Sequence, residues 1–112
     1  MDNFRISQTE LFHKLVKKLS KRYKHLEIDL DDFIDSIQSV NDLGIPLGKN
    51  VYKVRIKNSD TNKGKSSGYR LISYLEITAK EITFLYIYSK SDISNLKETD
   101  IDDLVLQLIN KI

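Results

Sequence analysis

Positively charged side chains alternate along one short segment near the middle of the chain. Lys53, Arg55 and Lys57 occupy every second position, and the apolar residues Val54 and Ile56 separate them. In a β-strand, residues two apart lie on the same face and repeat about every 7 Å. Because phosphates along a nucleic-acid strand have a comparable spacing, this row could contact several phosphates at once.

Arg70 begins the next strand-like segment and would meet this row if the two strands are neighbours. Arginine stays charged and binds a phosphate through two parallel N–H groups, so Arg70 is the first candidate for stabilising a pentavalent phosphorus. Several tyrosines of the same region could stack on bases, although packing between strands is their more common role. These tyrosines are Tyr69, Tyr74, Tyr86 and Tyr88.

The charges of the 112-residue chain are unevenly distributed, although they sum to only +2. Residues 1–48 carry a net charge of −1, residues 49–90 one of +6 and residues 91–112 one of −3. A basic middle region between acidic ends favours an anion-binding surface, with nucleic acid as the leading ligand. A solvated strand-and-loop region in a lysine-rich chain is the alternative explanation of the charges alone.

The composition excludes several other kinds of site. The chain has no cysteine, which excludes disulfides, thiol catalysis and cysteine-bound metals. Residues 64–66 resemble part of a phosphate-binding loop, but Ser59 stands where that pattern needs a glycine. Neither His13 nor His25 lies in a metal-binding motif, and the acidic runs lack the glycine and glutamate of a calcium loop. We therefore expect no metal and no cofactor.

The sequence contains no segment that predicts export or membrane insertion. No apolar leader begins it, and the longest apolar run, residues 82–88, is too short to span a bilayer. The absence of cysteine fits a reducing compartment. We expect a cytoplasmic protein that does not contact a membrane.

The first half of the chain predicts a helical hairpin. Residues 3–6 suit a short strand, after which Ser7 and Glu10 have the spacing of a helix-capping box. Apolar residues at helical spacing continue that helix to about residue 23, with lysines on its exposed face. Residues 26–40 form a second amphipathic pattern with an acidic outer face. Glycines and a proline then predict a loop over residues 41–50.

The second half changes to a period of two, which predicts strands. The segments 51–57, 69–77 and 82–88 should form an antiparallel meander, and the polar segment 58–68 should be a loop. A final helix is expected from about Thr99. The chain should thus be one domain, residues 1–112, of the α+β class. We expect the N-terminal helical hairpin and the C-terminal helix to pack on one face of a small twisted antiparallel β-sheet.

Three segments resemble the RelE/ParE superfamily of bacterial toxins, in particular its RelE/HigB-like branch. They are YKVRIK at residues 52–57, GKSSGYRLI at residues 64–72 and IYSKSD at residues 87–92. The order of the expected elements matches that family along nearly the whole chain. The resemblance implies a RelE-like fold and the toxin of a type II toxin–antitoxin system.

The resemblance also implies a reaction. Such toxins bind the A site of the 70S ribosome and cut mRNA there, using the RNA's own 2′-OH and no metal. Lys53 and Arg55 match the family's basic pair, Arg70 its phosphate-binding arginine, and Lys90 the basic position after the last strand. Further RNA contacts are expected from Lys57, Lys65 and Tyr88. The implied partners are a cognate antitoxin, the ribosome and mRNA.

The general acid and base remain open at this point. Neighbouring positive charges favour loss of a proton from a lysine, which makes Lys53 a candidate base, while Lys90 is a candidate acid. Some relatives carry a histidine or tyrosine near the C-terminus, but residues 96–98 here are Leu-Lys-Glu.

Two other functions compete with RNA cleavage. A ParE-like protein would inhibit DNA gyrase by protein binding, and an inert member would only bind its antitoxin. Neither would need Lys53, Arg55, Arg70 and Lys90 to converge. The position of these four side chains in the fold therefore separates a nuclease from the alternatives.

Overall fold

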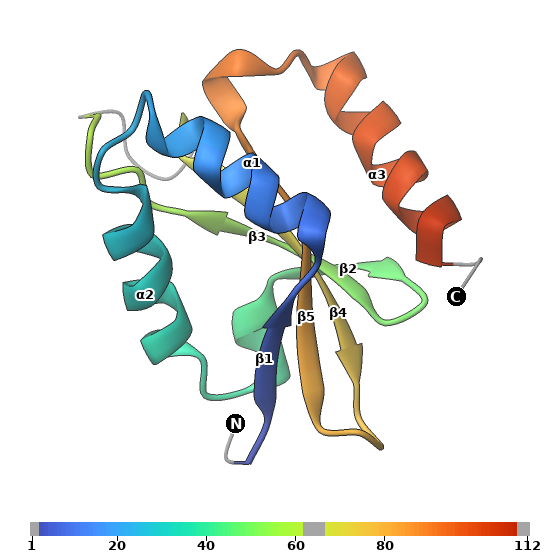
Figure 1. Ribbon diagram of the computed structural model, residues 1–112. Coiled ribbons are helices and arrows are strands. Elements are labelled where there is room, and N and C mark those ends of the chain that lie inside the picture. Colours follow the sequence, from blue (N-terminus) through green and yellow to red (C-terminus); the bar gives the residue numbers. More distant parts are fainter. Residues whose placement is uncertain (1–2, 62–66, 110–112) are drawn as a thin grey trace.

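The structure, a computed structural model, describes residues 3–61 and 67–109. Its five strands form one sheet in the order β1-β5-β4-β3-β2, and Figure 1 shows helices on both sides of it. The strands are β1 (Arg5–Gln8), β2 (Ile45–Gly48), β3 (Val51–Ile56), β4 (Tyr69–Glu76) and β5 (Glu81–Ser89). The helices are α1 (Glu10–Ser20), α2 (Leu26–Ser36), α3 (Asn95–Ile109) and the short 3₁₀ helices η1 (Val40–Leu43) and η3 (Lys90–Asp92). The predicted α+β class is confirmed.

The antiparallel meander of β3, β4 and β5 also agrees with the prediction. The sheet as a whole is mixed, however, because β1 pairs with β5 in parallel. The expectation of a purely antiparallel sheet is wrong at this edge. The connection from β1 to the rest of the sheet runs through the helical hairpin, and crossovers of that length allow parallel neighbours.

β2 is a strand that the sequence did not reveal, because Pro46 and Gly48 argue for a loop. Proline is tolerated on an edge strand, where its missing N–H costs no ladder hydrogen bond. β2 occupies that edge and pairs with β3, with Ile45 opposite Lys53. It therefore brings the chain segment after η1 beside the row of positive charges.

The helices cover both faces of the sheet, which corrects the expectation that all of them pack on one face. Leu71 joins a large core with Phe12 of α1 and Leu30 of α2, whereas its neighbour Ile72 joins a smaller core with Ile101 of α3. Successive strand residues point to opposite faces. α1 and α2 therefore lie on one side of β4 and α3 lies on the other, as Figure 1 shows.

α1 begins later than predicted. Ser7 belongs to β1, where its hydroxyl contacts that of Thr83 at 3.0 Å. Thr9 is the cap, and its Oγ1 accepts a hydrogen bond from the Phe12 N–H at 3.0 Å. Pairing with β5 therefore takes the residue that the capping-box pattern had assigned to the helix.

α2 is shorter than predicted and ends at Ser36. A capping box starts η1 instead, because the Asp42 Oδ2 atom accepts hydrogen bonds from the Gln38 N–H at 2.9 Å and the Ser39 N–H at 3.1 Å. Gly44 then leaves η1 with φ of 99°. This backbone conformation is open essentially to glycine alone, and it directs the chain into β2.

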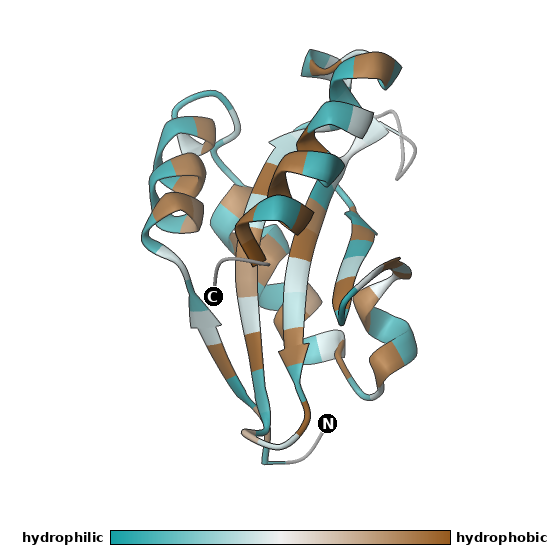
Figure 2. Ribbon diagram, turned by 90° about the vertical axis from the view of Figure 1, so that its right-hand side faces the viewer, coloured by the Kyte–Doolittle hydropathy of each residue, from teal (hydrophilic) through white to brown (hydrophobic). Residues whose placement is uncertain are grey.

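α3 begins at Asn95, four residues before the expected start at Thr99. The Ser94 Oγ atom accepts a hydrogen bond from the Lys97 N–H at 3.1 Å, which satisfies one free donor of the first turn. The early start places Glu98 on the helix, one turn before Asp102. Figure 2 shows α3 in front of the sheet, with hydrophobic and hydrophilic residues alternating along it.

No helix within the described part of the chain is both long enough and apolar enough to cross a lipid bilayer.

Candidate functional site

The register of the meander places three functional candidates in one row across the sheet. Arg55 on β3 pairs with Arg70 on β4, and Arg70 pairs with Tyr88 on β5. Directly paired residues share a face, and Lys53 shares it because it lies two residues before Arg55. Lys90 follows β5 at once, at the start of η3. The fold thus gathers all four cationic residues on the face that α3 covers.

A cavity of about 480 Å³ opens beside this row. Lys53, Arg55 and Arg70 line it, together with the backbone turn that leads into β2. Its lining also includes one carboxylate, that of Glu98. A cavity with three positive side chains in its wall suits an oxyanion.

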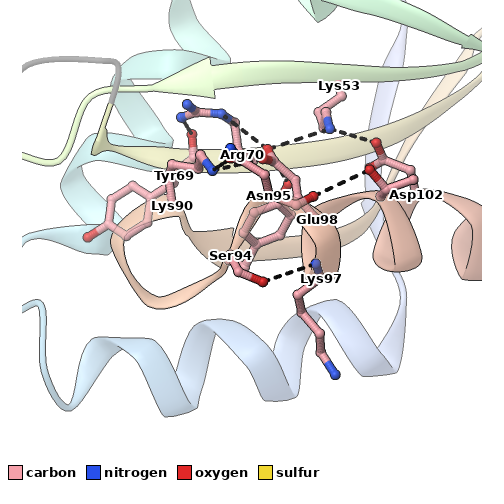
Figure 3. Close-up of polar contacts among 11 residues, drawn as sticks. Lys53, Tyr69, Arg70, Lys90, Ser94, Asn95, Lys97, Glu98 and Asp102 are labelled. Carbon is pink, nitrogen blue, oxygen red and sulfur yellow. Dashed lines mark hydrogen bonds and ion pairs between the residues drawn. The ribbon is translucent and has the colours of Figure 1, made fainter.

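Glu98 lies at the centre of the cationic residues (Figure 3). Its Oε2 atom lies 2.9 Å from the Lys90 Nζ, and its Oε1 atom lies 3.6 Å from the Lys53 Nζ and 3.9 Å from the Arg70 Nε. The Tyr88 hydroxyl donates a hydrogen bond to the same Oε1 at 2.8 Å. One carboxylate therefore contacts three of the four predicted cations.

Asp102 adds a second carboxylate from the next turn of α3, and its Oδ2 accepts a hydrogen bond from the Lys53 Nζ at 2.7 Å. Residues four apart lie on the same face of a helix, so Glu98 and Asp102 meet the sheet together. As a result, the side chain of Arg70 is only 6% exposed, that of Lys53 12% and that of Lys90 22%. Arg55 remains exposed. We call Lys53, Arg70, Lys90, Tyr88, Glu98 and Asp102 the α3–sheet cluster.

The environment sets the charge state of these groups. Desolvation alone would raise the pKa of Glu98, but hydrogen bonds from Lys90 and Tyr88 and the nearby positive charges lower it below its usual value. Burial, followed by the hydrogen bond to Glu98, raises the pKa of Tyr88. Burial and the adjacent Arg55 charge lower the pKa of Arg70, although an arginine still keeps its proton. At neutral pH Glu98 is therefore a carboxylate, Tyr88 a neutral phenol and Arg70 a charged guanidinium.

The remaining predicted RNA contacts lie elsewhere or are covered. Lys57 is exposed one residue after β3 and lines a separate small pocket with Asp29 and Asp32 of α2. Tyr88 is buried, so its ring is closed to a stacking base while α3 is in place. Lys65 lies outside the described residues.

Sequence reasoning missed Glu98 and Asp102. Their signal was present, since two acids four residues apart flank the apolar Ile101 on the last helix. With the last helix expected only from about Thr99 and all helices expected on one face of the sheet, nothing in the pattern placed these two acids beside the cations. Within residues 3–61 and 67–109, no group of three or more histidine or acidic side chains has the geometry to hold a metal ion.

A family model and solved structures are similar to this chain. Residues 4–109 match the family model described as the RelE toxin of the RelE/RelB toxin–antitoxin system. The isolated RelE toxin of E. coli superposes with a TM-score of 0.53 at 17% identity, covering 90% of this chain and 98% of that one. The toxin–antitoxin complex RelBE of E. coli gives a TM-score of 0.50 at 16% identity, covering 77% and 95%. No curated protein sequence matches.

Proposed function

Because this chain belongs to the RelE toxin family of RelE/RelB toxin–antitoxin systems, we propose that it is a ribosome-dependent mRNA endonuclease. It cuts mRNA during translation by attack of the RNA's own 2′-OH, and it uses no metal. The observation that carries this proposal is the convergence of Lys53, Arg70 and Lys90 on one carboxylate. A site that holds one carboxylate between several cations has the charge to hold a phosphodiester.

The reaction assigns a task to each group. The 2′-OH loses its proton to a base, its oxygen bonds to phosphorus, and the bond to the 5′ oxygen breaks as that oxygen takes up a proton. The products are a 2′,3′-cyclic phosphate and a free 5′-OH. Arg55 and Arg70 are direct partners on the neighbouring strands β3 and β4. Both can therefore stabilise the negative charge that grows on the phosphoryl oxygens.

The lysines are the candidates for proton transfer. Lys53 lies beside the two arginines in the sheet and is placed to accept the proton of the 2′-OH. Lys90 lies on the other side of Arg70 and is placed to protonate the leaving 5′ oxygen or to contact it as a cation. The hydroxyl of Tyr88 adds an uncharged hydrogen-bond donor to the same site.

The proposal includes two kinds of partner. Since a member of this family crystallised as a RelBE toxin–antitoxin complex, we expect a cognate antitoxin for this chain as well. The other partners are the ribosome and its mRNA, because the net charge of +6 over residues 49–90 suits an RNA-rich surface.

The test is primer extension on an mRNA translated with the purified toxin. Wild type should produce new 5′ ends within the reading frame, and Arg70→Ala should reduce their rate of formation by about 10²–10³-fold, as loss of a transition-state donor does. Arg70→Lys keeps the positive charge but lacks the planar guanidinium, so its cleavage rate should lie between those of wild type and Arg70→Ala. Lys17→Ala removes a positive charge from α1 on the opposite face of the sheet and should cut like wild type.

One outcome would instead favour a ParE-like function. If wild type leaves translated mRNA intact and blocks supercoiling by DNA gyrase, the endonuclease proposal is wrong. Cleavage that persists undiminished in Arg70→Ala would remove Arg70 from the site.

A further inference from the structure

We propose that Ile45 of β2 is a platform for a nucleobase of the bound RNA, the base attached next to the phosphate that the cations hold. The inference rests on the proposed function for the identity of the ligand. Its own evidence is the position, the exposure and the rigid placement of Ile45 at the wall of the cationic cavity.

The first argument is position. Ile45 pairs directly with Lys53, and directly paired residues share a face of the sheet. Its side chain therefore lies on the face of Lys53, Arg55 and Arg70, and it lines the same cavity of about 480 Å³. Val54 is the other apolar side chain in the lining, but it packs against the large core on the opposite face. Ile45 thus adds apolar surface to a wall that is otherwise charged on this face.

The second argument is reach. Cavities of about 300–1,000 Å³ hold whole small ligands, so this cavity has room for more than a phosphate group. Ile45 and Arg55 are diagonal neighbours on adjacent strands, and such pairs lie about 7–8 Å apart. A base is joined to its phosphate through a single ribose. A phosphate beside Arg55 and Arg70 therefore brings its own base, or the next one, to Ile45.

The third argument is exposure. Ile45 is 61% exposed, whereas Leu47, two residues along β2, packs against the small core beneath α3. A lone exposed apolar residue is ordinary on a protein surface. At the wall of a cavity lined by cations, however, its apolar surface lies where a base can cover it. Contact with the face of a base removes both surfaces from water.

The fourth argument is that the usual partners of a base are covered. RNA-binding sites stack bases on aromatic or other apolar side chains. Within residues 3–61 and 67–109 no tyrosine or phenylalanine is exposed, and Tyr88 on the cationic face is buried. Ile45 is exposed on that face and offers the surface that these rings do not.

The fifth argument is that Ile45 is held in place before a ligand arrives. A Cβ on Gly44 would clash with the Lys53 carbonyl oxygen, so glycine at this position lets β2 begin in close contact with β3. Pro46 favours an extended backbone for the residue before it, and a β-branched side chain has few rotamers. A platform that is already ordered loses little entropy on binding.

The chemistry of the side chain also sets the kind of recognition. Isoleucine has no group that donates or accepts a hydrogen bond, so it contacts the face of a base and not its edge. Every base has such a face, and the free energy of the contact grows with the apolar area that is buried. Ile45 should therefore accept all four bases and favour the larger purines.

The test separates the base from the phosphate. Two fluorescent single-stranded deoxyoligonucleotides of equal length are bound at one salt concentration, and neither can be cut because both lack the 2′-OH. One carries adenine at every position, and the other is abasic. Ile45→Ser should bind the adenine strand about tenfold more weakly than wild type, because the apolar contact is lost, and should bind the abasic strand like wild type. Ile77→Ser is the matched control, since Ile77 is 65% exposed after β4, and should change neither affinity.

A second variant should change the affinity in the opposite direction. Ile45→Tyr puts a planar ring on the platform, and tyrosine suits a strand. It should bind the adenine strand about threefold more tightly than wild type through stacking, a gain that misfolding cannot produce. An equal effect of Ile45→Ser on the two strands would overturn the platform. So would wild-type affinity of Ile45→Ser for the adenine strand, or a wild type that does not distinguish the strands.

Cleavage of translated mRNA distinguishes a failure of the platform from a failure of the proposed function. If wild type and Ile45→Ser cut equally fast and bind both strands equally, the endonuclease stands and the platform is refuted. If wild type does not cut, but its preference for the adenine strand is lost in Ile45→Ser, the endonuclease is refuted and the base contact of Ile45 stands.

Discussion

Arg55 and Arg70 are direct cross-strand partners on β3 and β4. Like charges placed directly opposite each other destabilise a sheet, and the Arg55 charge contributes to lowering the pKa of Arg70. A fold that brings two guanidinium groups together gains stability from an anion beside them. In the structure Glu98 supplies that anion from α3, and in the proposed reaction the mRNA supplies it.

Gly44→Ala should unfold the protein or destabilise it severely. A Cβ at this position would lie 2.0 Å from the Lys53 carbonyl oxygen, and the φ of 99° already disfavours any side chain. Gly48→Ala is the matched control, because it has a similar φ of 104° but no atom within 4 Å of the added Cβ. It should cost about 1–3 kcal/mol from backbone strain alone. Urea unfolding of both variants measures the difference, and equal losses would contradict the close packing of η1 against β3.

Glu98 should make the protein's stability depend on acid pH. Its pKa is lowered in the folded state from the usual 4.5, so its contribution is present above the unfolded pKa and is lost as pH falls through the folded pKa. Wild type should therefore lose more stability than Glu98→Gln between neutral and strongly acidic pH. Thermal unfolding at a series of pH values measures this, and parallel curves for the two proteins would contradict the ion pairs of the α3–sheet cluster.

His25 should titrate above its usual range. A hydrogen bond with the Asp60 carboxylate, and then the charge of Asp60, raise the pKa of His25 from 6.5. The pair therefore stabilises the fold fully below the unfolded pKa, and that contribution is lost as pH rises through the folded pKa. Asp60→Asn should return the His25 titration toward 6.5. NMR chemical shifts of the imidazole ring measure the His25 titration in wild type and in Asp60→Asn. Identical titrations in the two proteins would exclude the His25–Asp60 pair.

Ile101→Ala should loosen α3 without changing any charge. Ile101 is 5% exposed in the small core with Ile72 and Tyr88, and removing such a side chain costs about 2–5 kcal/mol. The loss should fall on the packing of α3 against the sheet, seen as faster amide exchange in that helix. Leu96→Ala, at a 77% exposed position of the same helix, should stay within about 0.5 kcal/mol of wild type.

The fold was predictable where one periodicity dominated. Lys53, Arg55 and their apolar neighbours alternate strictly, so β3 and the meander could be predicted. The two edge strands of the sheet could not be predicted, because they are determined by the strands they pair with and not by their own residue pattern. Ser7 pairs with β5 rather than capping α1, and Pro46 joins an edge strand that its residue type argues against.

The site was predictable on the sheet side alone. Strand spacing and antiparallel pairing were enough to bring Arg55 and Arg70 together. The contribution of α3 depended on which face that helix covers. The adjacent buried residues Leu71 and Ile72 of β4 carried that information, since consecutive apolar residues indicate a strand that is covered on both faces. With this pattern recognised, Glu98 and Asp102 would have been expected to meet the cations.

The most direct test of the central claim concerns the nucleophile. Primer extension first maps the cut in an mRNA bound to the ribosome, and the experiment is then repeated with a 2′-deoxy nucleotide on the 5′ side of that cut. Cleavage at this position should disappear, and the unmodified mRNA should yield a 5′ fragment that ends in a 2′,3′-cyclic phosphate. An mRNA that is still cut at the deoxy position, or one that wild type never cuts, would contradict the account.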